Sequence, residues 1–158
     1  MASNPAYHVV LYQPEIPQNT GNIGRTCLAI GAKLWLVRPL GFRVDEKSLR
    51  RAGLDYWQHV DWEVVDNWDE LLGRLPDKRP WLFSKRAEQI YTEAAFGLGD
   101  VFVFGNEDTG LPDSLCASFN DRMLRIPIQQ PVRSLNLANA VAVVVFEAVR
   151  QNSGDREQ

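Results

Sequence analysis

Short apolar runs alternate with helical segments along this chain, and that alternation constrains the fold more than any other feature. Five runs have the length and the β-branched or aromatic content of buried strands: 8–12, 33–37, 81–83, 101–104 and 123–126, and 60–65 could be a further short strand. Most are apolar throughout rather than alternating, as in strands that helices cover on both faces. The pattern predicts an α/β fold with a mostly parallel sheet flanked by helices.

Five helical segments are expected between and after these strands: 19–30, 45–52, 67–75, 112–118 and 134–150. Gly31 and Gly53 follow the first two, where glycine commonly ends a helix. Asp66 or Asn67 is the expected N-cap of the third segment, and Ser134 or Asn136 that of the last.

The chain has 158 residues, which favours one domain spanning 1–158. We expect an ordered core over about 7–151 and a flexible C-terminal segment over 152–158. The longest unbroken apolar run, 140–146, is far shorter than the roughly 20 residues of a membrane span. The N-terminus lacks the basic and apolar stretches of an export signal, so we expect a cytoplasmic protein that does not associate with membranes.

The two cysteines, Cys27 and Cys116, are far apart in the sequence. Without an export signal they are expected to be free thiols in a reducing compartment. Neither has metal-ligand spacing to a second cysteine or a histidine, so no metal site is expected.

The charge balance argues in two directions about nucleic acids. The net charge of −3 argues against a typical basic nucleic-acid binder, yet phosphates respond to the local field. Thirteen of the 17 basic residues are arginine, which makes forked contacts with phosphate. The basic residues come in groups: Arg43, Lys47, Arg50 and Arg51; Arg74, Lys78 and Arg79; Lys85 and Arg86. For any one group, an ordinary solvated face is the favoured explanation, since charged residues mostly lie on the surface.

Three polar loops follow predicted strands and enter helices, and ligands of parallel sheets bind in such loops. Loop 14–26 carries Arg25 near a helix start, where a positive charge opposes the helix dipole unless an anion lies close by. Loop 105–112 places Glu107 and Asp108 after a buried strand, where carboxylates are costly unless paired or used. Loop 126–136 is bounded by prolines. A plain strand-to-helix turn remains an alternative for each, and no spacing matches a phosphate-binding glycine loop.

Together the loops resemble the three motifs of the SPOUT class of RNA methyltransferases, in its ribose 2′-O-methylating branch. The motifs are Asn19-x-Gly21-x-x-x-Arg25, then Phe104-Gly105-Asn106-Glu107-x-x-Gly110-Leu111-Pro112, then Ile126-Pro127-Ile128 followed by Ser134-Leu135-Asn136-Leu137-Ala138-Asn139-Ala140. The likeness spans 9–150 and, with segments 11–17 and 50–56, extends to the small tRNA (cytidine/uridine-34) 2′-O-methyltransferases. Asn106 is a departure, since many members carry proline there.

This resemblance implies a C-terminal trefoil knot, a homodimer, S-adenosylmethionine as methyl donor with S-adenosylhomocysteine as product, and the tRNA anticodon stem-loop as partner. The implied cofactor-binding residues are Leu82, Phe83, Ser84, Gly105, Asn106, Glu107, Ile126, Ile128, Ser134, Leu135 and Asn139. The implied catalytic residues are Arg25, Asn19, Glu107, Ser134 and Asn136. The implied RNA-binding residues are Arg25, Arg43, Lys47, Arg50, Arg51 and Arg133, with Lys85 as an addition.

The resemblance also implies roles for these side chains. Arg25 is expected to clamp a phosphate and orient the hydroxyl, because a guanidinium with a pKa above 12 is a poor base. Asn19 is expected to hold Arg25 or the ribose. Glu107 is expected to brace Arg25 or Asn19 by a charged hydrogen bond, and Ser134 and Asn136 to complete the site.

Three other functions stay open at this point. The chain could methylate ribosomal RNA or another tRNA position. It could be an RNA-binding or assembly factor that has lost its chemistry, although the intact motif residues argue against this. It could also be a small-molecule α/β enzyme, which would show no salt-dependent affinity for RNA.

Overall fold

Seven parallel strands form one sheet in the order β3-β2-β1-β6-β4-β7-β5. The computed structural model describes residues 4–45 and 47–153. The strands are β1 Tyr7–Tyr12, β2 Ala32–Val37, β3 Trp62–Val65, β4 Trp81–Phe83, β5 Gln89–Ile90, β6 Val101–Phe104 and β7 Met123–Arg125. The predicted α/β fold with a parallel sheet is confirmed.

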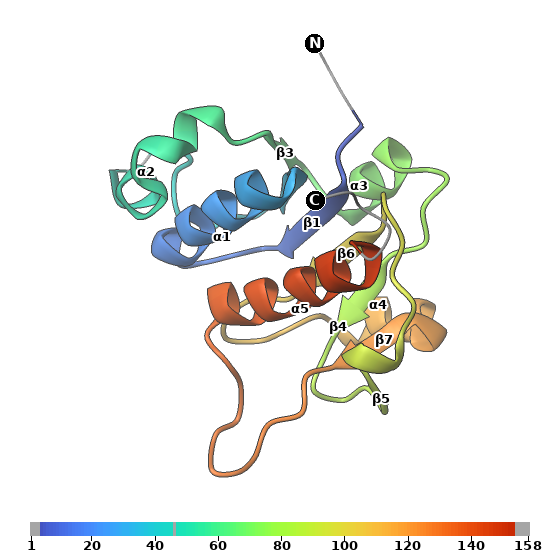
Figure 1. Ribbon diagram of the computed structural model, residues 1–158. Helices are drawn as coiled ribbons and strands as arrows, with labels where there is room; N and C mark the ends of the chain where they lie inside the picture. Colours follow the sequence, from blue (N-terminus) through green and yellow to red (C-terminus); the bar gives the residue numbers. More distant parts are fainter. Residues whose placement is uncertain (1–3, 46, 154–158) are drawn as a thin grey trace.

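Helices cover both faces of the sheet. They are α1 Pro17–Ile30, α2 Lys47–Gly53, α3 Trp68–Arg74, α4 Asp113–Ser118 and α5 Leu137–Asn152, with 3₁₀ turns over Leu54–His59, Tyr91–Glu93 and Asn120–Arg122. Figure 1 shows α1 and α5 next to each other in front of the sheet, with α2 beside α1. Helices α3 and α4 pack on the opposite face.

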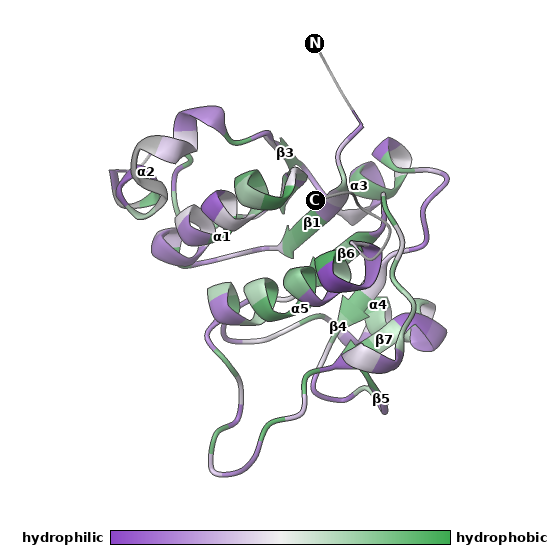
Figure 2. Cartoon of the chain, viewed as in Figure 1, coloured by the Kyte–Doolittle hydropathy of each residue, from purple (hydrophilic) through white to green (hydrophobic). Residues whose placement is uncertain are grey.

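Successive residues of β1 show how one strand serves both faces, because side chains alternate along a strand. Val9 packs into the cluster that contains Ile23 of α1 and Val144 of α5. Its neighbour Val10 packs into the second cluster, with Leu71 of α3. Figure 2 shows this apolar character along the strands and α5. Burial on both faces explains why the strands are apolar throughout.

Most predicted elements are confirmed, with shifted ends. Helix α1 begins at Pro17, earlier than predicted, because proline suits the first helical position. The helix predicted over 45–52 is observed as Lys47–Gly53 and continues as a 3₁₀ turn to His59 rather than stopping. The two-residue β5 and the turns at 91–93 and 120–122 were not predicted, since segments this short carry no periodic signal.

Three helix ends follow their sequence signals. Gly31 ends α1 in the left-handed conformation at φ 74°, and its N–H bonds to helix carbonyls. Asn67 caps α3 by accepting from the N–H of Glu70. Of the two candidates for α5, Asn136 is the N-cap, and its side chain accepts from the N–H of Asn139.

The end of α5, which reaches the first residue of the segment 152–158 that we expect to be flexible, is bonded to β1. Asn152 Nδ2 donates to the Tyr7 hydroxyl at 3.1 Å and to the Ala148 carbonyl at 2.8 Å. Residues 154–158 of that segment lie outside the described residues. Within the described ranges, no helix is both long and apolar enough to cross a membrane. The implied trefoil knot stays a prediction.

A buried histidine lies on the α3 face of the sheet. His8 Nδ1 accepts a hydrogen bond from Trp35 Nε1 at 3.1 Å. An accepting nitrogen carries no proton, so the imidazole is neutral. Burial, helped by the positive charges of Lys78 and Lys33, lowers the pKa of His8 to about 4.

Candidate active site

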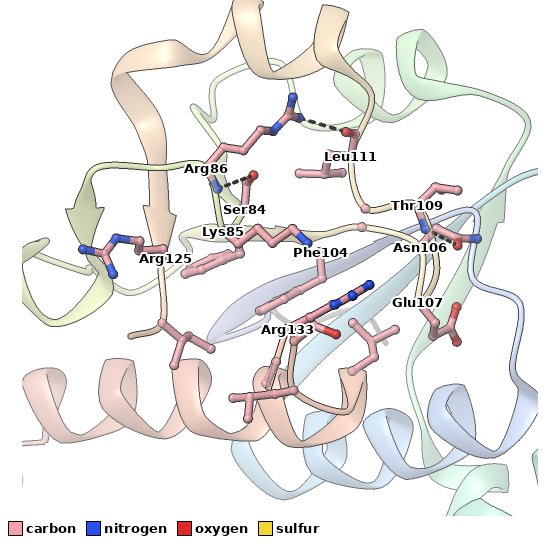
Figure 3. Close-up of a pocket in the computed structure, with 18 of the residues that line it drawn as sticks. Ser84, Lys85, Arg86, Phe104, Asn106, Glu107, Thr109, Leu111, Arg125 and Arg133 are labelled. Carbon is pink, nitrogen blue, oxygen red and sulfur yellow. Dashed lines mark hydrogen bonds between the residues drawn. The ribbon is translucent and has the colours of Figure 1, made fainter. Parts of the chain in front are cut away.

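A cavity of about 340 Å³ opens at the carboxyl edge of the sheet, where the polar loops after β4, β6 and β7 meet. Its volume lies in the range of small-molecule sites. Phe83 and Phe104 stack with ring centroids 4.7 Å apart on its floor, and Ile126 and Leu135 add apolar walls. Figure 3 shows polar side chains entering from several loops above this apolar base. Such a cavity suits a ligand with a flat apolar part and a polar remainder.

The loop after β6 is shaped by Gly105 and Asn106. A Cβ on Gly105 would collide with the backbone of Gly110 and Leu111, so only glycine permits this close approach. Asn106 Oδ1 accepts from the N–H groups of Asp108 and Thr109, while its Nδ2 donates to the Gln13 carbonyl at 2.6 Å. The Asn106 side chain thus fixes the loop and ties it to the segment after β1.

A chain of hydrogen bonds joins the three loops. Glu107 Oε1 accepts from the N–H of Glu15 at 2.8 Å, and Oε2 accepts from the N–H of Ile16 at 3.0 Å and from Asn19 Nδ2 at 3.3 Å. Asn136 Nδ2 then donates to Asn19 Oδ1 at 3.1 Å. Asn19 of the first loop, Glu107 of the second and Asn136 of the third therefore hold the three loops in one arrangement.

Glu107 also supplies the cap that α1 lacks in its own sequence. The N-cap position, Ile16, offers no side-chain acceptor, and the first turn has no acid. The first N–H groups of a helix need acceptors, and their positive end favours an anion. A carboxylate more than 90 positions away in the sequence serves both needs.

Arg25 lies apart from this network. It follows Asn19 by six residues, which turns it about 240° around α1. Its guanidinium lies over the ring of Tyr56 at 4.8 Å and makes no ion pair within the described ranges. Asn19 therefore bonds to Glu107 and Asn136 and not to Arg25, which corrects one expected contact. Of the two partners expected for Glu107, the structure selects Asn19.

Most of the expected cofactor-binding residues lie together. The cavity is lined by Phe83, Ser84, Gly105, Asn106, Glu107, Ile126, Ile128, Ser134 and Leu135. Leu82 is not among them, because it points into the core and is fully buried. Asn139 also lies outside the lining, and its backbone N–H is engaged by Asn136. Of the expected catalytic residues, Glu107 and Ser134 line the cavity, whereas Arg25, Asn19 and Asn136 do not.

Several lining residues were not predicted for the cofactor site. They are Lys85, Arg86, Phe104, Asp108, Thr109, Gly110, Leu111, Asp113, Arg125, Arg133, Leu137 and Ala140. Lys85 and Arg86 could have been predicted to lie at the site, because they closely follow the predicted strand 81–83. Arg86 pairs with Asp113 and donates to the Leu111 carbonyl at 3.3 Å, so it joins α4 to the cavity wall.

The expected RNA-binding residues are not gathered in one place. Lys47, Arg50 and Arg51 are exposed on α2, and Arg43 pairs with Asp45 at 3.5 Å just before it. Arg133 lies in the loop before α5, on the cavity wall. Figure 1 shows α2 and that loop well apart, at the upper left and the bottom of the view.

Comparison with known proteins decides the family. The family model described as SpoU rRNA Methylase family matches residues 6–146. The chain belongs to the SpoU methylase family. A family relative from Methylovorus glucosotrophus, named tRNA (cytidine(34)-2′-O)-methyltransferase, is 44% identical over 147 residues, covering 92% of this chain and 96% of the relative. A Burkholderia ambifaria relative of the same name is 46% identical over 148 residues, covering 92% and 95%.

Two solved structures share this fold. One, described as giving structural insights into the 2-OH methylation of C/U34 on tRNA, is 50% identical with a TM-score of 0.91, and the match covers 96% of this chain and 99% of that one. An AdoMet-bound rRNA methyltransferase from Sinorhizobium meliloti is 25% identical with a TM-score of 0.85, covering 95% of this chain and 58% of that one. SpoU methyltransferases use S-adenosylmethionine (AdoMet).

The cavity fits that cofactor. Gly105 lets the loop after β6 fold tightly at the cavity wall, where any side chain would collide with the backbone of Gly110 and Leu111. The apolar walls suit an adenine ring, and the Ser134 side chain, which lacks a partner within the described residues, offers a polar contact. No group of three or more histidine, cysteine or acidic side chains suited to a metal occurs among the described residues.

Proposed function

We propose that this chain transfers a methyl group from S-adenosylmethionine to the ribose 2′-hydroxyl of tRNA position 34, cytidine or uridine. The observation that carries the proposal is the similarity to a protein studied for C/U34 methylation. The two sequences are 50% identical over nearly the full length of both chains. Two of the three motif loops line one cavity, and hydrogen bonds from Glu107 and Asn136 hold the first loop against them, which supports the same reaction. A tRNA substrate would place the protein in the cytoplasm.

The cofactor would be held by Phe83, Ile126, Leu135 and the backbone of the loop at Gly105. When bound, it supplies an electrophilic methyl group. Much of the rate of such a transfer comes from positioning, because the reacting atoms must be in line. The Glu107–Asn19–Asn136 chain supports this by fixing the three loops relative to one another.

Arg25 has the properties of a phosphate clamp. Its guanidinium is exposed, stacks on Tyr56, and keeps its forked donors free within the described part of the chain. A guanidinium binds phosphate with two parallel hydrogen bonds. In the proposed reaction Arg25 grips a phosphate next to the target ribose and orients the hydroxyl, while the phosphate assists removal of the proton.

A homodimer would explain why Arg25 does not line the cavity of its own chain. Helix α5 exposes Val143 (39%) and Phe146 (50%), and Ile16 at the start of α1 is 42% exposed. Helices α1 and α5 contact each other, so these exposed apolar side chains belong to neighbouring elements and suit burial against a second copy. In the proposed dimer, Arg25 of one subunit serves the cavity of the other.

The proposal is tested by methyl transfer from labelled S-adenosylmethionine to tRNA lacking its own ribose methyls, with the products mapped. A 2′-O-methyl group at position 34 supports it, and methylation of another position or of ribosomal RNA overturns it. Arg25→Ala should abolish transfer and leave cofactor affinity within about twofold.

The dimer has two tests of its own. Phe146→Glu should give a monomer in light scattering, because it places a charge in an apolar interface. Co-expressed Arg25→Ala and Gly105→Val chains, each inactive alone, should regain part of the activity if Arg25 acts across the interface. No recovery would place Arg25 in its own subunit's site.

A further inference from the structure

A second hollow, of about 540 Å³, lies beside the cofactor cavity under the loop before α5. It is lined by Lys85, Arg125, Ile126, Ile128, Gln130, Pro131, Val132 and Arg133. Three of these residues are cations and none is acidic. The cofactor cavity, by contrast, includes Glu107, Asp108 and Asp113 in its lining. In a chain of net charge −3, this hollow is a local concentration of positive charge.

The three cations come from three segments and lack partners. Lys85 follows β4, Arg125 ends β7, and Arg133 lies in the loop before α5. None of them makes an ion pair or a side-chain hydrogen bond with another described residue. Several other arginines of the chain are paired with acids, as in Arg79–Asp121 and Arg150–Glu147. The charge of the hollow is therefore left for an external anion.

The side chains are spread out rather than closed around one point. In Figure 3, Lys85 and Arg133 extend toward the middle of the cofactor cavity, whereas Arg125 extends the other way. Lys85, Arg125 and Arg133 line both hollows, so the positive charge continues from one into the other. Spread cations suit a chain of anionic groups better than a single small ion.

We propose that Lys85, Arg125 and Arg133 bind the phosphodiester backbone of the substrate RNA next to the nucleotide that is methylated. This inference rests on the proposed function, because it places the RNA beside the cofactor. It adds Arg125 to the RNA contacts and gives Lys85 a defined place among them. Arginine and lysine contacts to phosphate position a nucleic acid without reading its sequence.

The experiment measures tRNA affinity at several salt concentrations for Arg125→Gln, Lys85→Gln and a matched control, Arg79→Gln. Arg79 is exposed and pairs with Asp121 away from both hollows. Each phosphate contact adds roughly 0.7–0.9 to the slope of log affinity against log salt. Arg125→Gln and Lys85→Gln should each lower the slope by about that amount and weaken binding several-fold, while Arg79→Gln should leave both unchanged.

Cofactor affinity, measured by calorimetry without RNA, separates the alternatives. Cofactor affinity within about twofold of wild type, together with the lowered slope, supports the proposal. A loss of cofactor affinity with an unchanged salt slope overturns it and assigns the cations to the cofactor carboxylate. If the wild type binds tRNA with the expected slope but methylates none, the proposed function fails and the phosphate site stands. If it methylates tRNA and neither variant alters the slope, the phosphate site fails alone.

Discussion

Replacing Glu107 by glutamine should destabilise the fold through helix α1, which begins 90 residues earlier in the sequence, at Pro17. The carboxylate accepts from the N–H groups of Glu15 and Ile16 and from Asn19 Nδ2. Glutamine has the same shape but one acceptor oxygen. If that oxygen takes the place of Oε2, it keeps the hydrogen bonds from the Ile16 N–H and from Asn19 Nδ2. The amide nitrogen then faces the N–H of Glu15, and because both groups are donors, that hydrogen bond is lost.

The magnitude follows from these contacts. The N–H of Glu15 is exposed, so water can replace the lost acceptor, and the cost is the net value of one hydrogen bond, about 0.5–1.5 kcal/mol. Loss of a negative charge at a helix N-terminus costs a further 0.3–1 kcal/mol or so. We expect Glu107→Gln to lower the free energy of unfolding by about 1.5 kcal/mol. For a domain of this size, that lowers Tm by about 3–6 °C.

Urea unfolding followed by circular dichroism measures this difference, with Asp108→Asn as the control. Asp108 is exposed, and its carboxylate makes no hydrogen bond or ion pair within the described residues. The control should stay within about 0.5 kcal/mol of wild type. A Glu107→Gln protein as stable as the control would refute the idea that this carboxylate caps α1.

Three further predictions concern single residues. Gly105→Ala should abolish cofactor binding in calorimetry and lower Tm, because the added methyl meets the backbone of Gly110 and Leu111. His8 has its pKa lowered to about 4, so its contribution to stability is complete above about pH 6.5 and is lost as the pH falls toward 4. Urea titrations should show a loss of up to about 3 kcal/mol over that window, and His8→Asn should show less. Burial raises the pKa of the Cys27 thiol, so a thiol reagent should label it only after unfolding, and rapid labelling of the native protein would contradict the structure.

The sequence by itself determined the elements of this fold and the edge at which the site lies. Hydrophobic runs located the longer strands, and Gly31 and Asn67 marked helix ends through local backbone geometry. Once the strands were recognised as parallel, the loops after β4, β6 and β7 had to meet at one edge. Local preferences suffice for these features, because each depends on residues only a few positions apart.

Only the tertiary structure decided how the motif residues are used. In the folded chain, Glu107 accepts hydrogen bonds at the start of α1, Asn136 donates to Asn19, and Leu82 is buried in the core away from the cavity. The tertiary structure also separated Arg25 from the cavity of its own chain. These outcomes depend on strand order and helix rotation, which bring residues 88 to 117 positions apart into hydrogen-bond distance. No local pattern encodes such pairings, since the groups that satisfy one another meet only when the sheet is assembled.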